Sequence, residues 1–418
     1  MNQKTQNKTT WKPGLSRRFA ALTFVVLLLG ACTLGAPPSS PAPAETAVPT
    51  QPLPSEVPPT QPLPSETPVP EPTAVSEVTA EPITYGPRVF PENVSQLTGK
   101  PIQDTTLLDR RPVAVKVQIF PRGQRPPLGV ALADIVYDYY QTFGLTRLHA
   151  IFYSQNAETV GPVRSARLLD QTLVFMYQSV FAFGSAEQRT YSRLFGSDFA
   201  NRLVVEGDAN CPPLCRSDPN GRNELVASTS ELTRYTSEKG VDNIRQDLSG
   251  MYFDSLTPAN GQPGTQAFVR YSISAYNMWD YNPQTGRYLR YQDTQEAADR
   301  TLENVEALMD GLTNEQIATD NVVFVLVPHQ YAFGTSPGVN EVIDIGLSGS
   351  GPAYAFRDGQ VYQTVWNRPG KNSALFLTYP DGSFYPFKPG STWFEVVGTS
   401  TKIENPSSGA WRYDHQMP

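Results

Sequence analysis

The sequence has few of the residues from which catalytic and metal centres are usually built. Its 418 residues include only three histidines and three cysteines. It has no phosphate-binding loop ending in Lys-Ser/Thr, no His-Glu-x-x-His motif, and no serine after the leader placed three residues before a lysine. These absences give no support to the P-loop, zinc-protease or penicillin-interacting classes, and they predict neither a metal nor a cofactor.

A basic face is also lacking. The net charge is −7; residues 1–31 carry five bases and no acid, residues 33–84 carry six acids and no base, and residues 85–418 therefore carry −6. Binding to phosphate backbones needs a net basic surface. We therefore expect no nucleic-acid partner.

No apolar run is long enough for a membrane-spanning helix, which needs about 20 residues. A basic stretch instead precedes the short apolar run Phe19–Leu29, as in a signal peptide. Leu29-Gly30-Ala31-Cys32 then resembles the lipobox of bacterial lipoproteins, in which the cysteine receives diacylglycerol before cleavage. The alternative is an ordinary secretory signal with an incidental cysteine.

Residues 33–84 contain no aromatic residue and are rich in Pro, Thr, Ser and Glu. A ten-residue unit beginning Gln-Pro-Leu-Pro-Ser-Glu occurs at Gln51 and again at Gln61. Such a composition buries too little apolar surface to offset chain entropy. It predicts a disordered tether between the membrane anchor and the folded region.

The remaining cysteines are Cys211 and Cys215, in Cys-Pro-Pro-Leu-Cys. Outside the cell, two cysteines this close favour a disulfide that closes a small loop. A metal role is disfavoured because no histidine lies nearby.

The chain after Tyr85 is expected to fold, with an α+β architecture. A mixed N-terminal domain of α/β type would be followed by a β-rich C-terminal domain, because strand and helix signals alternate irregularly. The expected segments are a signal peptide at 1–31, an anchor and tether at 32–84, domains at 85–247 and 268–398, and a tail at 399–418.

Several elements can be placed within these domains. Turn residues predict hairpins at 282–286, 357–360 and 380–383, and 240–267 has the composition of a linker. The other expected elements are strands at 112–120, 135–141, 148–153, 180–183 and 321–327, and helices at 168–178, 230–239 (capped by Ser230) and 299–310.

One segment stands out chemically, Val160-Gly161-Pro162-Val163-Arg164-Ser165-Ala166-Arg167. Cations at a helix start oppose the helix dipole, so Arg164 and Arg167 indicate an anion site, and we expect Arg147 to approach it from the preceding hairpin. The alternative is internal ion pairing with Asp134, Asp138 or Glu187.

Candidates for catalysis are weaker. Asp134 and Glu187 are the carboxylates that would serve an acid–base pair. His329 follows an apolar strand, where a lone histidine is more often structural than catalytic.

The motifs in the folded region resemble those of the YerB-like lipoprotein family. They occur in the family's order, as Arg111-Pro112-Val113-Ala114-Val115, Ala133-Asp134-Ile135-Val136-Tyr137, Gly161-Pro162-Val163-Arg164-Ser165-Ala166-Arg167, Phe356-Arg357-Asp358-Gly359 and Pro389-Gly390-Ser391-Thr392-Trp393-Phe394. The resemblance covers most of 100–398. It implies an exported lipoprotein with N- and C-terminal family domains and no known reaction.

The chain departs from the family pattern at two places. Gly184-Ser185-Ala186 stands where the family tends to have Gly-Gly-Ser, and Arg222-Asn223-Glu224-Leu225 stands where His-Asn-Leu-Tyr is expected. The missing histidine weakens an acid–base role at that position and leaves Asn223 as a candidate polar contact.

These observations lead to one functional expectation and two rivals. The chain is expected on the outer face of the cell membrane, anchored through a diacylglyceryl Cys32, as a non-enzymatic module that binds a cell-wall polymer or an envelope protein. The rivals are a glycan-acting enzyme with a carboxylate pair and a pure scaffold without a small ligand.

The anchor can be tested directly. Cys32→Ala removes the thiol that takes the lipid, so metabolic labelling with a clickable fatty acid should mark the parent protein and leave the variant unlabelled. Label persisting on the variant would contradict the lipobox interpretation.

Overall fold

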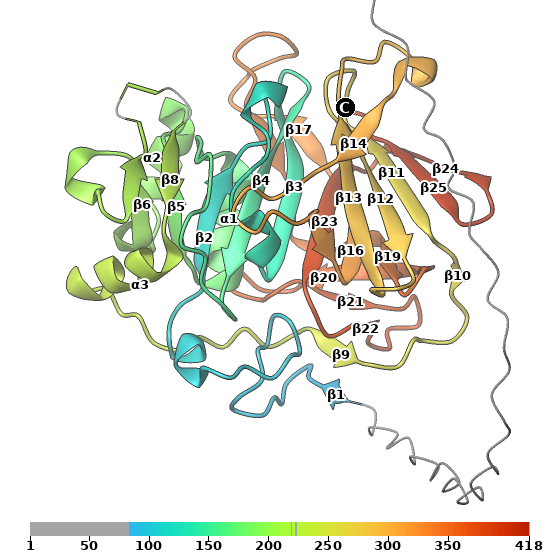
Figure 1. The fold of residues 1–418 in the computed structure, drawn as a ribbon, viewed down its shortest axis with the longest axis horizontal. Coiled ribbons are helices and arrows are strands. Elements are labelled where there is room, and N and C mark those ends of the chain that lie inside the picture. The colour runs from blue at the N-terminus through green and yellow to red at the C-terminus, as the bar shows by residue number, and fades with distance from the viewer. Residues whose placement is uncertain (1–82, 219, 222–223, 418) are drawn as a thin grey trace, which may run out of the picture. The chain divides into compact units, whose positions relative to one another are not determined.

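The computed structural model describes residues 83–218, 220–221 and 224–417. The expected signal peptide, Cys32 and all of the proline-rich segment up to residue 82 lie outside these residues, and so does Asn223. Thr84, the last residue assigned to the expected tether, already belongs to the first strand. The described part is β-rich with three α-helices, which agrees with an α+β class (Figure 1). Among the described residues, no helix has the length and apolarity needed to cross a membrane.

A mixed eleven-stranded sheet, the main sheet, forms the centre of the fold. The predicted apolar strand 321–327 lies inside this sheet, with every residue buried. In spatial order the strands are β10 (Gln262–Pro263), β20 (Gln360–Arg368), β19 (Gly349–Arg357), β16 (Asn321–Val327), β23 (Thr392–Gly398), β3 (Ile135–Thr142), β4 (Leu145–Phe152), β2 (Val113–Val117), β5 (Val180–Phe183) and β6 (Leu203–Val205), with β21 (Phe376–Thr378) on β20.

The two expected domains share this main sheet. Strand β3, from the first domain, pairs in parallel with β23, from the second, and the register places Asp138 beside Glu395. Hydrogen bonds between strands therefore continue across the boundary between the two domains.

A second sheet of seven strands covers the C-terminal part of the main sheet (Figure 1). Tyr413 stacks on Phe324 with ring centroids 3.8 Å apart, and Trp279 meets Trp393 edge to face at 5.1 Å. The strands are, in order, β14 (Val305–Ala307), β13 (Arg287–Asp293), β12 (Tyr276–Asn282), β11 (Gln266–Arg270), β25 (Ala410–Asp414) and β24 (Lys402–Ser407), with β15 (Ala318–Thr319) on β13.

Three helices and three small sheets complete the described fold. Helix α1 packs toward the main sheet, where the hydroxyls of Tyr177 and Tyr137 lie 2.6 Å apart. The helices are α1 (Leu168–Tyr177), α2 (Gln188–Phe195) and α3 (Thr229–Glu238), and the small sheets pair β1 (Thr84–Tyr85) and β22 (Pro386–Phe387) with β9 (Tyr252–Asp254), β17 (His329–Tyr331) with β18 (Ile343–Ile345), and β7 (Leu214–Arg216) with β8 (Leu225–Ala227).

Some local expectations fail for reasons of tertiary pairing. The predicted helix at 299–310 is wrong: Asp299 caps a single 3₁₀ turn, Arg300–Leu302, and Val305–Ala307 pairs with β13 instead. Helix α3 is capped by Ser228 rather than Ser230. Residues 240–267 contain strands β9 and β10, and residues 399–418 supply β24 and β25.

A fully buried arginine joins the two sheets. Arg290 on β13 donates to Asp138 Oδ2 at 2.7 Å and to Glu395 Oε1 at 2.5 Å, and all three side chains are inaccessible to solvent. Its guanidinium lies 5.0 and 4.9 Å from the rings of Trp279 and Trp393, within cation–π range. Burial, opposed by Arg290 and reinforced by Asp138, raises the pKa of Glu395 to about 7.

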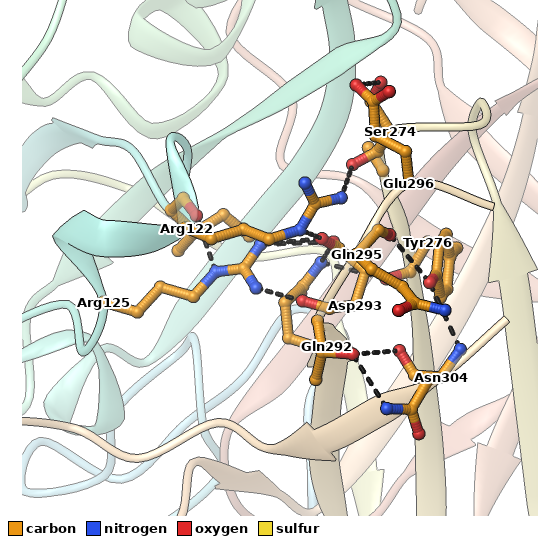
Figure 2. Close-up of polar contacts among 12 residues, drawn as sticks. Arg122, Arg125, Ser274, Tyr276, Gln292, Asp293, Gln295, Glu296 and Asn304 are labelled. Atoms are coloured by element: carbon orange, nitrogen blue, oxygen red, sulfur yellow. Dashed lines mark hydrogen bonds and ion pairs between the residues drawn. The ribbon is translucent and has the colours of Figure 1, made fainter. Parts of the chain in front are cut away.

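A second polar junction lies at the end of β13 (Figure 2). Figure 2 shows Arg122 and Arg125 reaching Asp293: Arg122 Nε donates to Oδ1 at 2.6 Å, and Arg125 Nη2 lies 3.2 Å from both carboxylate oxygens. Arg122 also donates to the carbonyl of Ser274 at 2.9 Å, and Gln292 donates to Asp293 at 2.6 Å. Asp293, on the second sheet, is thus held by two arginines of the first expected domain.

The two cysteines close a short loop at the edge of the N-terminal half. Cys211 and Cys215 form a disulfide with their Cα atoms 4.8 Å apart. Cys215 lies on β7, which pairs with β8.

Arg290→Met should cost about 3–5 kcal/mol of unfolding free energy at pH 7.5, because it leaves two buried carboxylates without their cation. Glu395 has a raised folded pKa, so its contribution to stability is complete below its unfolded pKa and is lost as pH rises through about 7. The loss in the variant should therefore be smaller at pH 5 than at pH 7.5.

Urea unfolding at both pH values measures these losses. Arg300→Met is the matched control, because Arg300 is half-exposed and pairs with Glu404 and Asp414 at the surface, so it should change little. Equal losses in the two variants would contradict a structural role for the Arg290 junction.

Cys211→Ser should lower the unfolding free energy by about 2 kcal/mol or less, because so short a loop removes little entropy from the unfolded chain. Mass spectrometry of a non-reduced digest should show the linked loop in exported protein. Two freely alkylated thiols would contradict the disulfide.

Candidate anion-binding site

The segment before α1 is held by backbone hydrogen bonds to two neighbouring strands and loops. Arg164 N donates to the Lys116 carbonyl on β2 at 2.9 Å, and Ala166 N donates to the Ser185 carbonyl at 2.7 Å. Arg167 is the N-cap of α1, and its own N–H donates to Asp170 Oδ2 at 2.6 Å. The predicted helix start is therefore confirmed, with a cation at its positive end.

Two of the three predicted arginines converge on one carbonyl. Arg147 Nη1 on β4 donates to the oxygen of Ser165 at 2.8 Å, and Arg167 Nη1 donates to the same oxygen at 3.4 Å and to the carbonyl of Ala166 at 2.9 Å. Among the described residues, no carboxylate lies within ion-pair distance of either guanidinium, and the buried Nε of Arg167 has no hydrogen-bond partner.

The arginines also influence one another electrostatically. Burial, followed by the neighbouring charges of Arg167 and Arg164, lowers the pKa of Arg147 to about 9, against the opposing effect of Tyr139 and Asp170. The charges of Arg167 and Arg164 thus act on Arg147 in the same direction as burial, and an anion bound here would oppose them.

Arg164 lies at the other end of this group. Burial lowers its pKa, Arg216 lowers it further, and Glu206 opposes the shift. Arg216 itself is paired with Glu206. The segment therefore presents Arg164 toward β6 and β7, and Arg167 toward α1 and α2.

Sequence reasoning missed a buried polar network around Asp170, the carboxylate that accepts from the backbone N–H of Arg167. Asp170 Oδ1 accepts from Tyr139 at 2.5 Å, from His149 Nδ1 at 2.8 Å and from Lys116 Nζ at 3.2 Å. Burial, only partly offset by Asp170, lowers the pKa of Lys116 to about 7. Burial opposes ionisation of Asp170, yet Lys116 and His149 hold its pKa below the usual range.

The sequence held one signal of this network. Lys116 interrupts the otherwise apolar strand Val113–Val117, all of which is buried. A charge at such a position needs a partner. Which carboxylate supplies it depends on the packing of α1 across β2, which sequence spacing does not reveal.

A cavity of about 380 Å³ opens beside Arg167. Ser165 and Ser185 line it with their hydroxyl oxygens 3.0 Å apart. The N-terminal turn of α2 and the segment 340–342 form other walls, so both expected domains contribute to it. The lining residues are Thr142, Phe143, Ser165, Arg167, Ser185, Ala186, Glu187, Arg189, Thr190, Asn340, Glu341 and Val342.

The two acids that line this cavity are already satisfied by the chain. Glu187 caps α2 through the N–H groups of Arg189 and Thr190, at 3.0 and 3.1 Å, and pairs with Arg189 Nε at 2.7 Å. Glu341 accepts from the N–H groups of Phe143 at 2.5 Å and Gly338 at 2.7 Å. Neither neutralises Arg167 by a direct ion pair.

The acids proposed as partners of Arg164 and Arg167 are engaged elsewhere. Asp138 pairs with Arg290, and the buried Asp134 accepts from the N–H groups of Tyr153 and Ser154. Burial raises the pKa of Asp134, against these hydrogen bonds. Asp134 is buried and does not line the cavity that Glu187 lines, so the described cavity does not present the two carboxylates together to a substrate.

His329 is a buried residue of β17. Its Nδ1 lies 2.8 Å from the carbonyl of Val327, and burial lowers its pKa to about 4. Its ring meets that of His415 at 5.0 Å. A buried, neutral imidazole bonded to the backbone carbonyl two residues earlier, at the end of β16, is poorly placed for catalysis.

The loop between β17 and β18 contains Gly334-Thr335-Ser336-Pro337-Gly338, which fits the letters of a Gly-x-Ser-x-Gly motif. A nucleophile elbow requires a turn from a strand into a helix. Here the segment runs from one short strand to another, so the structural context of that motif is missing. Within the described residues, no cluster of three or more His, Cys, Asp or Glu side chains is arranged to hold a metal.

Comparison with known proteins places this arrangement in a family. Two family models match, described as the N-terminal and C-terminal domains of a protein of unknown function (DUF3048), over residues 97–242 and 267–394. The chain is 28% identical over 303 residues to "Putative lipoprotein YerB" of Bacillus subtilis (strain 168), covering 69% of this chain and 82% of that protein.

A crystal structure of the YerB protein from Bacillus subtilis has the same fold. It matches with a TM-score of 0.59 at 26% identity and covers 73% of this chain and 96% of that chain. The expected resemblance is confirmed, and the chain belongs to the DUF3048 family of YerB-like proteins, of which it carries both domains.

Proposed function

We propose that this protein is a lipid-anchored, extracytoplasmic receptor that binds an anionic group of an envelope component in the cavity beside Arg167. The relative from Bacillus subtilis carries the word lipoprotein in its name, and the leader of this chain ends in Leu29-Gly30-Ala31-Cys32. Both support placement at the outer face of the membrane.

The observation that carries the binding proposal is the charge balance of the site. Within the part of the chain that the structure describes, Arg147 and Arg167 donate only to backbone carbonyls, while Glu187 and Glu341 beside them accept from other groups. Desolvating a guanidinium without a counter-charge is unfavourable. A phosphate or carboxylate would supply the missing charge and meet the forked donors of arginine in two parallel bonds.

The serine hydroxyls add to this argument. Ser165 and Ser185 stand at the cavity wall and hydrogen-bond to each other, which leaves one of the two O–H groups to donate to an oxyanion. That hydroxyl and a guanidinium match the several acceptor oxygens of one tetrahedral or planar anion.

A pure scaffold is the rival that this site argues against most directly. Scaffolding arginines would be expected to pair with buried carboxylates, as Arg290 does. A glycan-acting enzyme that uses Asp134 and Glu187 receives no support from their separate hydrogen-bonding roles.

Arg167→Lys should weaken binding of inorganic phosphate at least about tenfold, because lysine keeps the charge but loses the bidentate fork. Calorimetric titration of a soluble form that begins at Thr33, without the lipidated Cys32, measures the affinity. The melting temperature should stay nearly unchanged, because Arg167 holds no buried carboxylate through an ion pair.

Arg234→Lys is the control, since Arg234 lies exposed on α3 and pairs with Glu231 and Glu238. It should bind phosphate as the parent does. A parent protein that binds neither phosphate nor acetate, or an Arg167→Lys variant that binds as tightly as the parent, would refute the receptor proposal.

A further inference from the structure

The segments that form the Arg167 cavity carry apolar side chains that are exposed to solvent, of which Phe143 lines the cavity itself. Phe143, at the tip of the β3–β4 hairpin, is 58% exposed, and Phe333 and Val339, in the loop between β17 and β18, are 40% and 61% exposed. Exposed apolar groups of this size that gather at one place mark an interaction site more often than isolated ones do.

Contacts between the tip of the β3–β4 hairpin and the β17–β18 loop hold these residues near the cavity. Glu341 accepts from the N–H of Phe143 with one oxygen and from the N–H of Gly338 with the other. Arg189, a lining residue on α2, donates to the carbonyl of Phe333 at 3.3 Å. The hairpin tip, the loop and α2 are thus tied together around the cavity.

The two phenylalanines lie at backbone positions whose conformation disfavours them. Phe143-Gly144 and Phe333-Gly334 have positive φ at both residues, with φ of 52° and 55° at the two phenylalanines. Asparagine or aspartate is preferred before glycine in such turns, and Asp358-Gly359 follows that preference in this chain. Both turns instead keep a large apolar side chain that is exposed and conformationally costly.

We call the exposed side chains of Phe143, Phe333 and Val339 the rim of the cavity. Positive charge lies beside this apolar surface. The guanidinium groups of Arg189 and Arg193 lie 4.8 and 5.4 Å from the ring of Phe333. The part of a bound anionic ligand that extends out of the cavity would therefore lie against both arginine side chains and a phenylalanine ring. That pairing of surfaces is complementary to a molecule with a charged head and an apolar chain.

We propose that the cavity takes the phosphate headgroup of an anionic lipid and that the apolar chain of this lipid lies on Phe143, Phe333 and Val339. This inference rests on the proposed anion site and names its ligand class. The anchor is compatible with it: fifty residues separate Cys32 from Ile83, and a chain of that length spans up to ~170 Å when extended. Such a reach leaves any face of the fold free to meet the membrane.

Two soluble probes with the same phosphate monoester separate the inference from the proposed function. The soluble form that begins at Thr33 is titrated with glycerol 3-phosphate and, below its micelle concentration, with dihexanoylphosphatidic acid. The parent should bind the lipid at least about tenfold more tightly, because the acyl chains remove rim surface from water. Arg167→Lys should weaken both probes by a similar factor.

Phe333→Asn tests the apolar surface at a residue that does not line the cavity. Asparagine tolerates positive φ, so the fold should melt no lower than the parent. Affinity for the lipid should fall toward that for glycerol 3-phosphate, which should itself be unchanged. Phe384→Asn is the control, because Phe384 is 41% exposed but lines no part of this cavity, and it should change neither affinity.

Each contrary outcome has a distinct meaning. Equal affinity of the parent for the two probes would overturn the lipid inference and leave the anion site standing. Binding of neither probe would overturn both. A third contrary outcome combines two results: Arg167→Lys leaves lipid binding unchanged, and the parent binds dihexanoylphosphatidylcholine with equal affinity. The rim would then be a non-specific apolar surface, and the inference would be overturned.

Discussion

The buried contact of Arg290 with Asp138 and Glu395 is the interaction on which the described fold depends. The parallel pairing of β3 with β23 brings two carboxylates side by side in a solvent-free interior, which by itself would be strongly unfavourable. Arg290 enters from the second sheet, beside two tryptophan rings, and pairs with both carboxylates, so its single positive charge offsets one of the two negative charges. The contact therefore fixes the register of the central strands and the position of the second sheet together.

That dependence also explains why both expected domains form one structural unit. Asp293, a few residues from Arg290 on the same strand, is gripped by Arg122 and Arg125. Asp310 similarly accepts from the N–H groups of Gly129 and Ala131. The two halves thus meet at three buried acids, Asp138, Asp293 and Asp310. The cavity beside Arg167 also has walls from both halves, so it needs them to be held together.

Local features were predictable from the sequence, and long-range ones were not. The strand at 321–327, helix α1 and the hairpin turn at 282–286 follow from apolar spacing and turn residues, which act within a few residues. The helix predicted at 299–310 fails because Val305–Ala307 meets a strand that no local pattern reveals. The pairing of β25 with β11, some 140 residues away in sequence, is equally invisible to local reasoning.

The same division holds within the site. Arg164 and Arg167 were identifiable because they precede a helix, and Arg147 because it lies on the preceding hairpin. Asp170 was overlooked as a plain residue in the first turn of that helix, although it collects Lys116, His149 and Tyr139. Glu341 belongs to a loop nearly 200 residues from the hairpin tip that it binds, so only the fold brings it to the cavity.

The two arginine sites differ in a way that bears on function. At the junction one guanidinium serves two buried acids, and burial raises the pKa of Glu395 so that the excess negative charge can be relieved by a proton. At the cavity the imbalance is reversed: Arg147 and Arg167 share the carbonyl of Ser165, and burial together with neighbouring cations lowers the pKa of Arg147. A guanidinium keeps its proton at neutral pH, whereas a buried carboxylate can take one up, so proton transfer cannot balance the cavity in the same way. Charge brought from outside the chain can, and an open cavity beside Arg167 is where such charge would enter.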